Sequence, residues 1–151
     1  MLFRSIETTT QLNTAGVDLA ALEGVHAMTD VTGFGLLGHL HEICRGSKLR
    51  AEIRLDALPI LSSAKHVAQA GHATGASDRN WASLAAHVSL PAGCAEWQKK
   101  VLTDPQTSGG LLVACERAAA SEVLDIFKRQ GFKYACEIGM LAAGTPAIAV
   151  T

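Results

Sequence analysis

The sequence lacks long hydrophobic runs, a secretory signal and an excess of charge of either sign. No apolar stretch reaches the ~18 residues that a membrane-spanning helix needs. Lys and Arg total 13 against 14 Asp and Glu, which leaves a net charge of -1. A strongly basic surface for nucleic acid is therefore not expected. These absences predict a cytoplasmic globular protein with neither a membrane nor a nucleic-acid partner.

The cysteines also lack the spacing of a metal site or a disulfide framework. None belongs to a CxxC pair, and they lie far apart along the chain. We expect buried thiols in a reducing compartment, with zinc bound by cysteines and some of the six histidines as the alternative. The four positions are Cys44, Cys94, Cys115 and Cys136.

The P-loop and hydrolase motifs are absent as well. GxxxxGK[ST] does not occur, which argues against a P-loop. Gly33, Gly35 and Gly38 do have the GxGxxG spacing, but that spacing alone is a weak signal and we do not interpret it as a dinucleotide-binding turn. No serine stands in a GxSxG context, so a hydrolase nucleophile is not expected. Any phosphate site in this chain must therefore be built without a P-loop.

The chain does contain enough apolar residues for one domain of 151 residues, since 48% of them are hydrophobic. Residues 1–12 are set apart as a leader that is disordered or foreign to the domain, and residues 13–151 form the domain itself. Helices and strands are mixed without strict alternation, which favours an α+β fold. The expected helices are 13–22, 32–45, 60–70, 79–87, 95–102 and 118–130, the expected strands are 25–28, 51–55, 111–115, 134–138 and 147–150, and residues 72–78 are an expected loop.

The first segment with chemical potential follows the expected strand at 25–28. Asp30 is followed by a glycine-rich turn, Thr32, Gly33 and Gly35, that leads into a helix. Free amides at a helix start attract phosphate, glycines let a ligand approach the backbone, and a carboxylate can hold Mg²⁺. The alternative is structural, in which Asp30 or Thr32 caps the helix and the glycines allow close packing.

The second segment is a polar loop that leads directly into the expected strand at 111–115. It combines Asp104 and two hydroxyl side chains with two glycines, and such loops form oxyanion cradles. The alternative is a turn whose side chains satisfy their own backbone. The candidate ligand residues here are Thr107, Ser108, Gly109 and Gly110.

A third polar group lies at residues 77–81. Arg79 could pair with a phosphate and Asn80 could bind a ligand, although an aspartate-capped helix explains the same residues. His39 and His41 stand two residues apart on the expected helix at 32–45, so they cannot share one face. We interpret these two histidines as packing or surface residues rather than ligands.

Together, the segments TDVTGFGLLGH at residues 29–39 and DPQTSGGLL at residues 104–112 closely resemble selenophosphate synthetase. GASDRNWAS at residues 75–83 is similar to a further segment of that family. The resemblance extends from about residue 13 to the end of the chain. It implies a mixed β-sheet covered by helices, as in the carboxy-terminal domain of the aminoimidazole ribonucleotide synthetase superfamily.

The resemblance also implies an activity, in which ATP, selenide and water give selenophosphate, AMP and phosphate with Mg²⁺ as cofactor. It implies a homodimer, and an amino-terminal domain with the reactive cysteine or selenocysteine that is absent here. No catalytic residue is expected in this chain, which is predicted to be inactive alone. By resemblance Asp30 is the metal ligand, and the phosphate- or nucleotide-binding residues are Thr32, Gly33, Gly35, Asn80, Thr107, Ser108, Gly109 and Gly110.

Two alternatives remain open at this point. The chain could belong to a related ATP-dependent synthetase or kinase of the same superfamily, although the DPQTSGG loop favours the selenium enzyme. It could also be a non-catalytic module that binds a nucleotide or a protein, with Asp30 as a helix cap and the glycines as packing residues.

Overall fold

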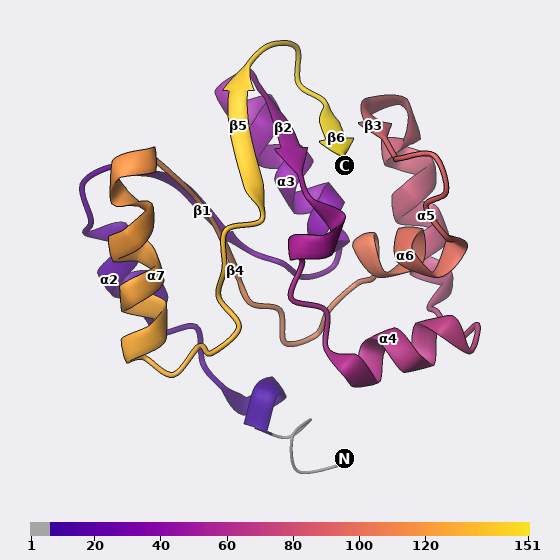
Figure 1. The fold of residues 1–151 in the computed structure, drawn as a ribbon, viewed down its shortest axis with the longest axis horizontal. Coiled ribbons are helices and arrows are strands. Elements are labelled where there is room, and N and C mark those ends of the chain that lie inside the picture. The colour runs from indigo at the N-terminus through magenta and orange to yellow at the C-terminus, as the bar shows by residue number, and fades with distance from the viewer. Residues whose placement is uncertain (1–6) are drawn as a thin grey trace.

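The computed structural model describes residues 7–151, and these form two β-sheets with helices packed around them (Figure 1). A small antiparallel sheet pairs β1 (Val25–Asp30) with β4 (Leu111–Cys115). The second sheet is mixed, because β2 pairs antiparallel with β5 but parallel with β6, which is also parallel to β3. Its order is β3 (Val88–Ser89), β6 (Ile148–Val150), β2 (Leu49–Ile53) and β5 (Gly139–Ala143). The expected α+β fold is confirmed.

Apart from α3, which lies between them, the labelled helices form two groups at opposite ends of the molecule (Figure 1). α2 packs against α7 beside the small sheet, while α5 and α4 both contact α6 at the other end. Within residues 7–151, no helix is both long and apolar enough to cross a membrane. The bounds are α2 (Ala15–Ala20), α3 (Gly35–Ser47), α4 (Ser62–Gln69), α5 (Gly75–Leu84), α6 (Glu96–Leu102) and α7 (Ala120–Arg129), with short 3-10 turns η1 (Leu55–Ala57), η2 (Ala85–His87) and η3 (Arg117–Ala119).

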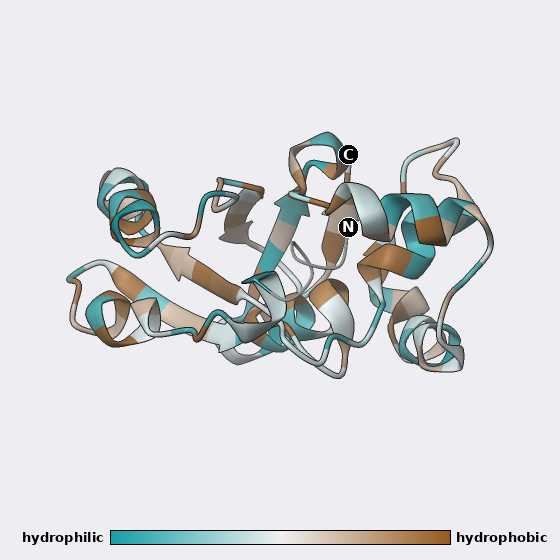
Figure 2. Cartoon of the chain, turned by 90° about the horizontal axis from the view of Figure 1, so that it is seen from below, coloured by the Kyte–Doolittle hydropathy of each residue, from teal (hydrophilic) through white to brown (hydrophobic). Residues whose placement is uncertain are grey.

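Two hydrophobic clusters hold these groups together. The larger cluster lies between the mixed sheet and α3, where Leu37 and Ile148 are almost fully buried. The smaller one joins α2 and α7 to the small sheet through Leu19 and Phe127. In Figure 2 the helices at both ends are banded with hydrophobic and hydrophilic residues, as amphipathic helices should be. The segment from β1 to α3 connects the two clusters.

Several expected elements differ from the structure. The strand expected at 134–138 is wrong, because the strand lies at Gly139–Ala143, where it pairs with β2. The loop expected at 72–78 is also wrong in its second half, since α5 already begins at Gly75. Helix α3 begins three residues later than expected, and the helix expected at 60–70 begins at Ser62.

The segment expected to be a leader is described in part. Residues 1–6 lie outside the described residues. Residues 7–10 are helical, and Gln11 donates a hydrogen bond from Nε2 to the carbonyl oxygen of Gln130 at 3.3 Å. The described part of this segment therefore contacts the end of α7.

Candidate functional site

The fold brings the two glycine-containing polar segments side by side. The amide nitrogen of Val31, just after β1, donates to the carbonyl oxygen of Gly110 at 2.8 Å. The amide nitrogen of Gln106 donates to the carbonyl oxygen of Thr32 at 3.0 Å. Asp30 is paired with Leu111 across the small sheet. The turn after Asp30 and the loop before β4 thus form one continuous backbone surface.

Asn80 on α5 joins this surface to the third polar group. Its side-chain nitrogen Nδ2 donates to the carbonyl oxygens of both Gly33 and Thr103, each at 3.0 Å. An amide nitrogen carries two hydrogens, so these two bonds use both of them. Asn80 therefore ties the turn after β1 to the end of α6, and any ligand contact would be left to its side-chain oxygen.

We predict that Asn80→Ala lowers the free energy of unfolding by about 2 kcal/mol, because the carbonyl oxygens of buried Thr103 and exposed Gly33 lose their donor. Urea denaturation of the two proteins measures the difference. The matched control is Ser83→Ala on the same helix, since Ser83 is exposed and its hydroxyl donates to the carbonyl oxygen of Asn80 at 2.8 Å within the helix. That change should cost less than about 0.5 kcal/mol. Equal losses in the two variants would show that Asn80 is not a structural clamp.

The start of α3 shows whether Asp30 or Thr32 caps this helix. The helix begins at Gly35 with Phe34 as its N-cap, and among residues 7–151 no side chain caps this end. The hydroxyl of Thr32 instead lies 3.4 Å from Nε2 of His39. The interpretation of Asp30 or Thr32 as the cap of this helix is therefore wrong.

The glycines of the site divide into two kinds. A Cβ atom on Gly35 would lie 2.6 Å from the carbonyl carbon of Thr103, and one on Gly109 would lie 1.6 Å from the carbonyl oxygen of Val31. These two glycines are buried, and close backbone packing explains them. Gly33 and Gly110 are exposed, with open space where a Cβ would stand. Only the second kind leaves room for a ligand beside the backbone.

Asp30, Thr107 and Ser108 are exposed on this surface, and their roles as ligand residues remain predictions. Mg²⁺ prefers oxygen ligands and is commonly held by one or two carboxylates together with substrate phosphates. Asp30 can supply one such carboxylate. Residues 7–151 contain no group of three or more His, Cys, Asp or Glu side chains that could hold a metal ion by themselves. The donor set fits Mg²⁺ only when phosphate, water or further groups complete it.

The remaining side chains of the third polar group are engaged within the protein. The hydroxyl of Ser77 donates to Oδ1 of Asp104 at 3.3 Å, and Nη1 of Arg79 donates to the carbonyl oxygen of Gly75 at 3.3 Å. Asp78 pairs with Lys100, whose hydrogen bond holds the pKa of the carboxyl below its usual value. Arg79 is thus drawn toward its own helix.

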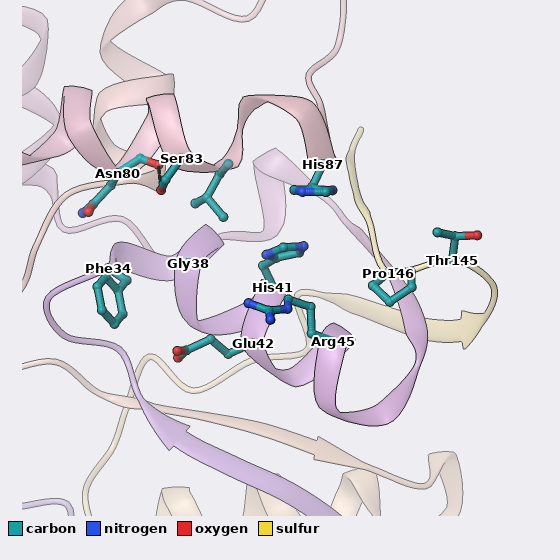
Figure 3. Close-up of a pocket in the computed structure, with 11 residues that line it drawn as sticks. Phe34, Gly38, His41, Glu42, Arg45, Asn80, Ser83, His87, Thr145 and Pro146 are labelled. Atoms are coloured by element: carbon teal, nitrogen blue, oxygen red, sulfur yellow. Dashed lines mark hydrogen bonds between the residues drawn. The ribbon is translucent and has the colours of Figure 1, made fainter.

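A pocket lies on the other side of α3 from β1 and β4, between α3, α5 and the turn before β6 (Figure 3). Of the predicted ligand residues, Asn80 alone lines it. Its other polar wall residues include His41, Arg45 and His87. Sequence reasoning missed this pocket because its walls come from segments that are distant along the chain. The histidines themselves were the available signal.

Comparison with known proteins places these features in a family. The model of the AIR synthase related protein, C-terminal domain, matches residues 7–150. The chain is 54% identical over 145 residues to "Selenide, water dikinase" from Dechloromonas aromatica (strain RCB), covering 96% of this chain and 42% of that protein. It is 50% identical to proteins of the same name from Pseudomonas straminea and Rhizobium meliloti (strain 1021), covering 96% of this chain and 41% and 42% of theirs. The chain thus spans about two fifths of the length of these relatives.

Proposed function

The chain belongs to the AIR synthase related family as its C-terminal domain, and we propose that it serves as the carboxy-terminal domain of a selenophosphate synthetase (selenide, water dikinase). The activity proposed for the whole enzyme converts ATP, selenide and water into selenophosphate, AMP and phosphate. One observation carries the assignment of a role to this domain. Asp30 ends a strand beside the 107–110 loop, and the hydrogen bond from the amide of Val31 to Gly110 holds the two together.

In this proposal Asp30 supplies a carboxylate to Mg²⁺ on the phosphate side of the enzyme. Bound Mg²⁺ offsets negative charge on the phosphate oxygens during transfer. The exposed hydroxyls of Thr107 and Ser108 and the open backbone at Gly33 and Gly110 offer hydrogen bonds to phosphate oxygens. Asn80 keeps the turn and the loop at a fixed separation. The chain's own part is thus to position one acid and a set of phosphate contacts.

Phosphoryl transfer from ATP needs more charge compensation than one carboxylate and one domain supply. We therefore expect the reactive nucleophile and further metal ligands outside the residues of this chain, and we expect the whole enzyme to be a homodimer. The four cysteines are free in the structure, as a cytoplasmic enzyme requires. The proposal accordingly includes a cytoplasmic location.

A domain exchange tests the function. The matching 145 residues of the Dechloromonas aromatica relative are replaced by this chain, and AMP formation from ATP is measured with and without selenide. We expect selenide-dependent AMP formation by the chimera and none by the isolated chain. A chimera that folds but forms no AMP would contradict the proposal and favour a non-catalytic binding module. AMP formation by the isolated chain would refute the need for residues outside it.

A further inference from the structure

The pocket between α3 and α5 has a volume of about 530 Å³, and one end of it is lined by basic side chains (Figure 3). His41 and Arg45 enter from α3, and His87 enters from η2. Phe34 and Leu84 provide apolar wall away from that end, while Pro146 lies beside Arg45. The pocket therefore combines an apolar side with a basic end.

His41 is a buried polar group without a partner. The residue is only 7% exposed, and within residues 7–151 its Nε2 atom makes no hydrogen bond. A buried polar atom left unpaired typically costs about 1–3 kcal/mol. His41 lines the pocket but its Nε2 is closed to solvent, so a group bound in the pocket could supply the missing partner once the ring turns toward it. This unpaired nitrogen is the observation that indicates a ligand.

The charges around His41 favour an anion as that ligand. The rings of His41 and His87 stack with centroids 4.7 Å apart, and Arg45 also faces the pocket. Burial lowers the pKa of His41, and His87 and Arg45 lower it further, while Glu42 acts in the opposite direction. Glu42 is an exposed acid whose carboxylate lies 3.3 Å from Nδ1 of His39. When His41 is protonated, its charge and that of Arg45 therefore face one acid that already has a neighbour, and an anion would offset their repulsion.

A metal ion is a poorer fit for the same residues. The two imidazole planes are inclined by only 22°, and the in-plane lone pairs of stacked rings do not converge on one ion. No group of three metal-binding side chains was found in the described part of the chain. The basic end thus lacks the converging ligands that zinc requires.

We propose that this pocket binds a small organic oxyanion, a phosphate or carboxylate group on an apolar body. The anionic head lies against Nε2 of His41 and the guanidinium of Arg45. The apolar body lies against Phe34 and Leu84. Protonated His41 donates to the head group, so binding is stronger at acidic pH and weakens as the pH rises through the pKa of His41 in the complex.

A histidine-detected NMR titration of the full chain tests this proposal, with phenyl phosphate as the probe at constant ionic strength. The Cε1–H resonance of His41 is assigned by its absence from His41→Gln. At saturation the pKa of His41 should rise by about one unit, because the anion binds the protonated ring more tightly. Inorganic phosphate, which lacks the apolar body, should bind about tenfold more weakly. Benzoate distinguishes a preference for a carboxylate head from one for phosphate.

Two controls keep the experiment decisive. The resonances of His66 and His72, which are exposed on other segments, should not move with the probe. Arg45 is exposed, so Arg45→Gln should preserve the fold while weakening phenyl phosphate about tenfold through loss of a charge-assisted hydrogen bond. An unchanged His41 resonance would overturn the proposal. So would equal shifts at all exposed histidines, or a response to Zn²⁺ with none to phenyl phosphate or benzoate.

Discussion

Gly109→Ala should destabilise this protein by about 3 kcal/mol or more, a large part of the roughly 5–15 kcal/mol that stabilises a typical domain. A Cβ atom at this position would lie 1.6 Å from the carbonyl oxygen of Val31 and 2.5 Å from its carbonyl carbon. These are backbone atoms, so rotation of a side chain cannot relieve the contact. The loop must move away from the turn after β1, and the hydrogen bond from Val31 to Gly110 would be lost. Urea denaturation followed by circular dichroism measures the change.

The neighbouring residue provides the matched control. Gly110 has no atom within 4 Å of the place where a Cβ would stand, so Gly110→Ala should change the free energy of unfolding by less than about 0.5 kcal/mol. The two variants add the same methyl group to adjacent residues of one loop. Similar stabilities for them would show that the loop does not pack against Val31 as described.

The same contact shows what the sequence could and could not predict about the site. The glycines and the acid stand in segments whose composition alone suggested a ligand-binding turn and a polar loop. Which glycine packs and which stays open depends on the distance between two backbone segments. Gly109 and Gly110 are identical in type and adjacent in sequence, yet one is buried against Val31 and the other is exposed. Tertiary contacts make that distinction, and the local sequence pattern does not predict it.

Helices were predicted more successfully than strands for a related reason. The apolar spacing that predicted α3 and α7 is a local property, and both helices are present with small shifts of their ends. α3 starts later than expected because its first residue, Gly35, adopts a positive φ of 68°, so a regular helix cannot extend back through it to Thr32.

The strand near the carboxy terminus was misplaced because its position depends on pairing. β5 begins at Gly139, opposite Ile53, where a Cβ would lie 2.0 Å from the carbonyl oxygen of Glu52. The close approach of β2 requires a glycine at this position. Gly139 is therefore the first residue of the strand and does not follow the end of a strand at 134–138. The division into two sheets likewise depends on partners that are distant in sequence.

The pocket behind α3 was missed because tertiary contacts, and not the local sequence pattern, bring its walls together. His41 and His39 were judged by their spacing on one helix, which correctly separated them onto different faces. The ring that stacks on His41 is His87, which lies beyond two further helices in the chain. Only the folded arrangement places the two rings in contact beside Arg45.

In the chimera with the Dechloromonas aromatica relative, Asp30→Asn should lower the rate of AMP formation by about a hundredfold or more. The amide keeps the size of the side chain but removes the negative charge that would hold Mg²⁺. Asp30 is exposed, so the fold should survive with a change of less than about 0.5 kcal/mol in the free energy of unfolding. Steady-state AMP formation at increasing Mg²⁺ measures the effect, and higher Mg²⁺ should restore part of the rate.

The control for this prediction is Asp125→Asn, because Asp125 is also an exposed aspartate and lies on α7, away from the turn after β1. It should leave the rate unchanged, so that a loss specific to Asp30 cannot be attributed to the general removal of a surface charge. If the two variants formed AMP at the same rate, Asp30 would have no chemical role in the reaction. Asp30 would then lie beside the 107–110 loop only because β1 pairs with β4 and Gly109 packs closely against Val31.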